Sequence, residues 1–269
     1  MTGVDRITRA FRKSRDEGRL GFVPYLTAGD PDLDGTRRLT AALAAAGADV
    51  LELGVPWNRP TVDGPVMPRK APSSPGVPMD IDAVLTSLPV IRGGPDFPPV
   101  VLSSDLDPIL RLGEEVFAER AAAAGVDGVL LTGPPGGQLE RARAVLVERG
   151  LAAVPLVNSD IGDDGVEAIA RTGAGFVHLA STGFLDDEGR MRSELLKVAA
   201  RVREQTRLPV AIGFGISSAR QLSGLHGAAD AFVAGNALES IVDRLGASDE
   251  AVEAVATLAR KFVAAGSNR

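Results

Sequence analysis

The sequence predicts an α/β fold, a single (β/α)8 barrel domain that spans residues 1–269. Short apolar runs alternate along the chain with longer segments of helical periodicity, which is typical of parallel βα units. Most of the runs are apolar on both faces, as expected for strands that pack inward in a barrel and are covered by helices outside. No linker long enough to divide the chain separates these units.

Eight runs are predicted to form the barrel strands. They are residues 21–26, 50–53, 100–103, 128–131, 153–157, 175–179, 209–213 and 231–234. A glycine-containing segment precedes several of them, and its glycines are expected to end the preceding helix. Residues 59–78 are rich in proline and residues 184–190 are rich in acids. Both segments follow strands, so we expect them at the rim of the barrel where active sites lie.

Composition limits the kinds of partner. The formal net charge is −6 and no basic cluster is present, which argues against nucleic acid or an anionic membrane and favours a small-molecule ligand. The absence of cysteine excludes disulfides and thiolate chemistry, and the two histidines lie far apart in the sequence. Cysteine-ligated and histidine-rich metal sites are therefore excluded, and we expect no metal and no cofactor. The first twenty residues lack the apolar run of a signal peptide or membrane span, so a cytoplasmic location is expected.

Two carboxylates occupy contrasting positions. Glu52 lies inside the apolar run 48–53, whereas Asp63 precedes a Gly-Pro turn in a loop. Apolar surroundings disfavour the ionised form of a carboxyl group, so an acid there can both give and take a proton. The pair predicts acid–base chemistry. The alternative is that Glu52 is half-exposed at a strand end and that Asp63 only stabilises a turn.

Two glycine-containing loops indicate a phosphate site. Gly213 and Gly215 follow the seventh run, while Gly235 and Asn236 follow the eighth and open a helical segment. Backbone N–H groups at a helix start bind anions, and loops after strands seven and eight of barrels often build such a site. The alternative is tight packing of strand against helix.

Five motifs, taken together, resemble the tryptophan synthase alpha subunit family. They are residues 22–31, 52–56, 63–66, 213–217 and 235–238. The resemblance implies a (β/α)8 barrel that cleaves indole-3-glycerol phosphate reversibly to indole and glyceraldehyde 3-phosphate. It further implies that Glu52 is the general acid/base and that Asp63 stabilises positive charge on the indole nitrogen. Phe22 and Phe214 are expected to line the substrate pocket.

The sequence departs from the family pattern around the site. Arg59 stands where the family has an aspartate on a loop that communicates with the beta subunit, and the prolines of residues 67–75 interrupt a family helix. Both changes argue against tight coupling to a beta subunit. Leu185 replaces a threonine that contacts the catalytic aspartate, and Asp186, with the next acid, adds negative charge near the phosphate. The alternative is that these acids point to solvent.

Two pocket aromatics are also replaced. Asp105 and His178 stand where the family has tyrosines, and we expect both to contact substrate. His178 is in a position to hydrogen-bond Glu52, although a core histidine bound by backbone groups is an equal alternative. The leading hypothesis is a carbon–carbon lyase that acts on indole-3-glycerol phosphate or a related compound. The alternatives are a non-catalytic binding or regulatory barrel, and a magnesium site made by Glu52, Asp63 and Asp105.

Overall fold

The computed structural model describes residues 1–56, 79–94, 96–134, 136–158, 161–180, 193–213 and 216–267. Both segments predicted to be irregular, residues 59–78 and 184–190, lie outside the described residues. The strands are β1 (Gly21–Thr27), β2 (Leu51–Gly54), β3 (Val100–Asp105), β4 (Gly128–Thr132), β5 (Ala152–Val154), β6 (Leu156–Val157), β7 (Val177–Ala180), β8 (Val210–Gly213) and β9 (Ala231–Ala234). All of their pairings are parallel.

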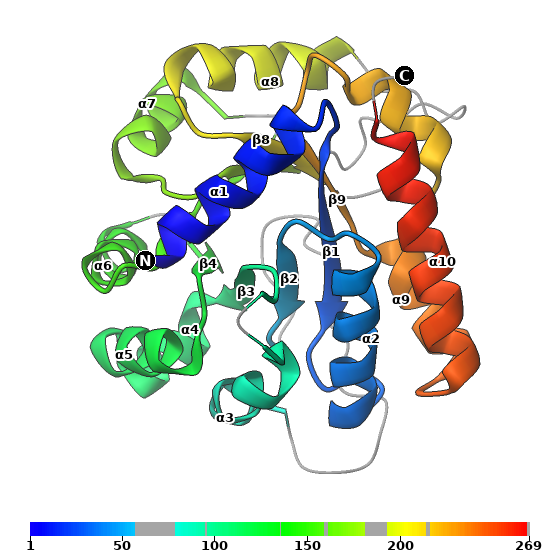
Figure 1. The fold of residues 1–269 in the computed structure, drawn as a ribbon. Coiled ribbons are helices and arrows are strands. Elements are labelled where there is room, and N and C mark those ends of the chain that lie inside the picture. The colour runs from blue at the N-terminus through cyan, green and yellow to red at the C-terminus, as the bar shows by residue number, and fades with distance from the viewer. Residues whose placement is uncertain are drawn as a thin grey trace.

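Helices connect and cover the strands. They are α1 (Gly3–Asp16), α2 (Leu33–Ala45), α3 (Ile81–Arg92), α4 (Leu106–Leu112), α5 (Glu114–Ala124), α6 (Gly137–Glu148), α7 (Asp163–Thr172), α8 (Ser193–Gln205), the 3-10 helix η1 (Ala219–Leu225), α9 (Asn236–Leu245) and α10 (Asp249–Ala265). Figure 1 shows the strands at the centre and the helices in a ring around them. The predicted (β/α)8 barrel is confirmed.

Proline interrupts the fifth barrel strand. The sheet order is β5-β4-β3-β2-β1-β9-β8-β7-β6, so β5 and β6 lie at its two ends. They are the two halves of the single run predicted over residues 153–157, separated by Pro155. Proline has no N–H to continue a ladder, but its carbonyl accepts a 2.9 Å hydrogen bond from His178 N on β7. Nine strands thus occupy eight positions around the barrel.

Alternate side chains along each strand separate two cores. One set packs outward against the helices, and the other fills the barrel interior. The inner set includes Ile7 and Phe11 from α1, and the Phe11 ring contacts Phe176 edge-on at 5.2 Å. Figure 1 shows α1 lying across one end of the barrel. Helix α1 therefore closes the interior at the amino ends of the strands.

The same arrangement of two hydrogen bonds occurs three times at the amino ends of the strands. An aspartate just before a strand donates its N–H to the carbonyl of a residue at the start of another strand, and its carboxylate accepts the N–H of that same residue. Asp49 pairs in this way with Phe22, Asp127 with Val100, and Asp230 with Val210. Each carboxylate also has an arginine within ion-pair distance. These are Arg19 at 2.6 Å, Arg6 at 3.4 Å and Arg203 at 3.5 Å, respectively.

The glycines expected to end helices do so in two different ways. Gly125 ends α5 with φ of +85°, and Gly47 follows α2 with φ of +102°, both in the left-handed region that glycine favours. Gly173 ends α7 with extended backbone instead, and the positive φ moves to Gly175. None of the helices in the described ranges is both long and apolar enough to cross a membrane.

Candidate active site

Glu52 faces the interior of the barrel. It follows Val50 of the inner core by two residues and lies in register with Tyr25 on β1 and Val101 on β3, which belong to the same inner core. Its side chain is 2% exposed. The position expected from the sequence, a carboxyl group inside an apolar strand, is the one observed.

His178 on β7 contacts Glu52 from the opposite wall. The imidazole Nδ1 lies 3.4 Å from Glu52 Oε2, and the histidine side chain is fully buried. This separation is longer than a usual N–H···O hydrogen bond, so the two groups make a close polar contact. Among the described residues, Glu52 Oε2 accepts no hydrogen bond. A buried carboxylate is costly without a partner, and His178 supplies that partner.

Gly213 makes room for the His178 ring. A Cβ atom placed on Gly213 would lie 2.5 Å from His178 Nε2 and 2.7 Å from Val233 Cβ. The end of β8 therefore packs directly against the imidazole, and only glycine fits between the ring and β9. This contact gives Gly213 a packing role, while its predicted phosphate contact stays a prediction.

Tyr25 is the inward aromatic that sequence reasoning missed. Its side chain belongs to the inner core, and a Cβ on Gly54 would lie 2.0 Å from the tyrosine hydroxyl, so the ring crosses β2 two residues beyond Glu52. Phe22 faces the other side of β1, because it is an odd number of residues away from Tyr25. Its ring stacks on Phe232 at 5.1 Å and approaches Phe262 of α10 at 6.0 Å, outside the barrel wall. The assignment of Phe22 to the substrate pocket is therefore corrected, because that ring packs under the helices.

Asp105 ends β3 and is held by a threonine. It is 7% exposed, and its Oδ1 accepts a 2.6 Å hydrogen bond from the Thr132 hydroxyl at the end of β4. Asp105 follows the inward Val101 by four residues, so it too faces the interior, nearer the mouth than Glu52. The interior at the carboxyl ends of the strands is thus polar and acidic.

An acidic side chain that was not predicted lies beside the second of the two predicted phosphate loops. Gly235 is the N-cap of α9 and Asn236 is its exposed first residue, as the motif predicts. Glu239 lies in the first turn of this helix and accepts a 2.6 Å hydrogen bond from the Thr27 hydroxyl on β1. Free N–H groups and the helix dipole attract an anion here, whereas the carboxylate opposes it.

Asp63, Phe214 and Gly215 lie outside the described residues, as do Arg59, Leu185 and Asp186. In the part of the chain that the structure describes, no three His, Cys, Asp or Glu side chains gather as a metal site would require. The catalytic role of Asp63 and the place of Phe214 and Gly215 in the site stay predictions.

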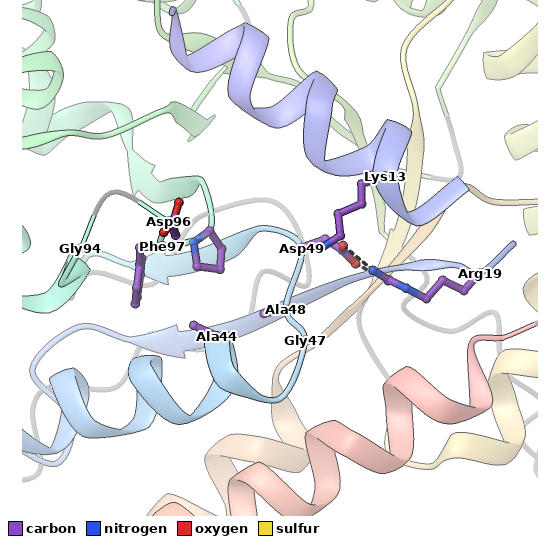
Figure 2. Close-up of a pocket in the computed structure, with 10 residues that line it drawn as sticks. Lys13, Arg19, Ala44, Gly47, Ala48, Asp49, Gly94, Asp96 and Phe97 are labelled. Carbon is purple, nitrogen blue, oxygen red and sulfur yellow. Dashed lines mark hydrogen bonds and ion pairs between the residues drawn. The ribbon is translucent and has the colours of Figure 1, made fainter. Parts of the chain in front are cut away.

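A cavity of about 420 Å³ lies at the other end of the barrel. Figure 2 shows it between α1, the end of α2 and the segment before β3, with Lys13, Asp96 and the Arg19–Asp49 ion pair around it. Its residues precede the strands. Active sites of (β/α)8 barrels lie at the carboxyl ends, so this cavity is separate from the site around Glu52.

A parallel barrel with a buried acid and histidine facing one another in its interior is typical of the (β/α)8-barrel enzymes. The family model of the tryptophan synthase alpha chain matches residues 11–266. The chain belongs to this family.

Individual relatives agree. The chain is 35% identical to the tryptophan synthase alpha chain of Bordetella parapertussis over 98% of this chain and 94% of that one. It is 36% identical to that of Synechococcus elongatus over 95% of each. The crystal structure of tryptophan synthase subunit alpha from Legionella pneumophila superposes with a TM-score of 0.86 at 28% identity, over 98% of both chains. The resemblance inferred from the motifs is confirmed.

Proposed function

We propose that this chain is a carbon–carbon lyase that cleaves indole-3-glycerol phosphate, or a closely related compound, by a retro-aldol step. Membership of the tryptophan synthase alpha chain family supports this class of reaction. The observation that carries the proposal for this chain is the buried Glu52 carboxyl group held against His178 inside the barrel. A carboxyl group shielded from water in this way is suited to delivering a proton to a bound ring.

In the proposed step, Glu52 gives its proton to the ring carbon that carries the side chain. Positive charge then develops on the ring nitrogen, and Asp63 stabilises it. The side-chain hydroxyl next to the ring then returns a proton to the Glu52 carboxylate and becomes an aldehyde carbonyl as the carbon–carbon bond breaks, as the family resemblance implies. The electron pair of that bond returns to the ring and neutralises the nitrogen. The role of Asp63 is taken from the family resemblance alone.

The side chains on the inner face of the barrel favour a substrate that has a flat ring and also makes polar contacts. Tyr25 offers an aromatic face beside Glu52. Asp105 and His178 replace aromatic side chains of the family pattern, so they favour a substrate with hydrogen-bond donors at its rim. This difference is why a compound related to indole-3-glycerol phosphate is part of the proposal.

We further propose that phosphate binds weakly and that coupling to a beta subunit is weak or absent. Gly235 and Asn236 stand at the start of α9, where backbone donors favour an anion, and Gly213 and Gly215 are predicted to add to them. Glu239, however, places a carboxylate in the first turn of the same helix. The argument about the beta subunit depends on Arg59 and the prolines that follow it. Purification as a tight, mutually activating complex with a tryptophan synthase beta subunit would contradict it. The cytoplasmic location and the single-domain organisation stay predictions.

The test is release of indole from indole-3-glycerol phosphate by the purified chain, with and without a beta subunit. We expect indole from the parent protein alone, and a rate ~10²- to 10⁴-fold lower from a folded Glu52→Gln variant. If the parent binds glycerol 3-phosphate but releases no indole under either condition, the lyase proposal fails and the non-catalytic barrel replaces it.

A further inference from the structure

The contact between His178 and Glu52 joins opposite walls of the barrel. Their strands, β7 and β2, lie four positions apart whichever way one counts around the sheet. The two side chains therefore span the interior. Val50 and Phe176, each two residues earlier, belong to the apolar core that fills the barrel below. The pair is thus the floor of any pocket that opens at the carboxyl ends of the strands.

The imidazole ring has little freedom to leave this position. It is fully buried, its Nδ1 side faces Glu52, and its Nε2 side abuts the backbone of Gly213. Close packing on both sides fixes the ring plane. A fixed ring in turn fixes the direction of the carboxyl group that it contacts.

We propose that His178 is a positioning residue, whose Nδ1 holds the Glu52 carboxyl group toward the substrate. This proposal rests on the proposed function of Glu52 as the acid. When Glu52 gives up its proton, the imidazole stabilises the carboxylate that remains. The other titratable side chains on the inner faces of the described strands are Tyr25 and Asp105.

Kinetics of three variants test the positioning role. His178→Leu removes the polar contact, and we expect kcat to fall by up to ~10²-fold with little change in KM, because the acid is misdirected. His178→Asn places an amide nitrogen close to where Nδ1 lies, so it should restore the polar contact and recover part of kcat. His226→Asn is the control, because the only other histidine follows η1 at the amino end of β9. It should behave as the parent.

A spectroscopic measurement makes the test independent of turnover. With His226→Asn as background, the protein has a single imidazole, and its ring ¹⁵N shifts at fixed pH report on His178. We expect these shifts to change with Glu52→Gln and not with the distant Glu250→Gln. Unchanged shifts with Glu52→Gln, or parent kcat and pH profile in His178→Leu, would overturn the positioning role. Shifts that do change in a protein that releases no indole support the pairing while the proposed function fails.

Discussion

The hydroxyl group of Thr27, the last residue of β1, donates a 2.6 Å hydrogen bond to Oε1 of Glu239 in the first turn of α9. The bond ties the rim of the barrel to the helix whose amino end is the proposed phosphate site. A carboxylate in a first turn stabilises the helix dipole. It also competes there with any bound anion.

Replacing Glu239 by Gln should therefore tighten the binding of glycerol 3-phosphate. The amide keeps an acceptor for Thr27 but removes the charge, and like charges about 4 Å apart repel by roughly 1 kcal/mol in water, which corresponds to about fivefold in Kd. Calorimetric titration measures the change. Glu250→Gln, the same substitution on the exposed start of α10, is the control and should leave Kd unaltered. Equal or weaker binding to Glu239→Gln would show that this carboxylate does not face the anion.

Gly213→Ala should harm both stability and turnover. The new methyl group would meet His178 Nε2 and Val233 Cβ at distances that no relaxed structure tolerates. Overpacking of this kind costs about 1–3 kcal/mol of unfolding free energy, and displacement of the imidazole should also lower kcat. Urea unfolding and the indole assay measure the two effects. Gly137→Ala, where a Cβ meets nothing within 4 Å, is the control. A fully active Gly213→Ala protein would contradict the packing described for His178.

Asp49→Ala should destabilise the amino end of the barrel. Asp49 accepts two guanidinium hydrogen bonds from Arg19 and the N–H of Phe22, and its carboxylate raises the pKa of Arg19 through the first of these contacts. Loss of one partner of a buried pair costs about 3–5 kcal/mol. Glu167→Ala, which breaks the exposed pair with Arg171, should change unfolding free energy by about 0.5 kcal/mol or less. Similar losses in the two variants would contradict the structural role of Asp49.

The pH dependence of stability should carry opposite contributions from two aspartates. Burial raises the pKa of Asp127 above its ordinary value despite the hydrogen bond from Val100 N–H and the charges of Arg6 and Arg92. The folded state then binds more protons than the unfolded state. The contribution of Asp127 to the free energy of unfolding is therefore lost as pH rises through the raised pKa of this residue. Hydrogen bonds from the Thr2 N–H and hydroxyl lower the pKa of Asp5, so its contribution is lost as pH falls.

Urea unfolding of the parent, Asp127→Asn and Asp5→Asn across the acidic range measures both signs. Relative to the parent, Asp127→Asn should gain stability with rising pH, and Asp5→Asn should lose it. Parallel curves for all three proteins would show that neither group titrates differently on unfolding.

Much of the fold was predictable because each strand is a short run of apolar residues. The predicted bounds of the strand 231–234 are the observed ones, and the predicted bounds of the other strands differ from the observed ones by at most two residues at either end. The break at Pro155 was visible in the sequence, but its consequence was not, because a proline can end a strand or merely interrupt it. Only the pairing of the two halves with different neighbours shows that the strand continues.

The site was predicted less completely. Glu52 is predictable because a charge inside an apolar run is conspicuous. The pocket aromatic is harder to predict, because Phe22 and Tyr25 belong to a run that is buried on its two faces. The alternation of side chains along a strand distinguishes the two. Tyr25 lies in register with Glu52 and faces the same side of the sheet, whereas Phe22 faces the other side. Glu239 was missed because its partner, Thr27, is far away in the sequence.

The most direct test of the central claim compares indole release by the parent and by Glu52→Gln on indole-3-glycerol phosphate. The amide keeps the size and shape of the carboxyl group but cannot transfer the proton, and loss of an acid–base group typically costs ~10²- to 10⁴-fold in rate. Circular dichroism and unfolding curves should show that both proteins are folded. We expect kcat to fall within that range. A folded Glu52→Gln protein that releases indole at nearly the parent rate would contradict the account.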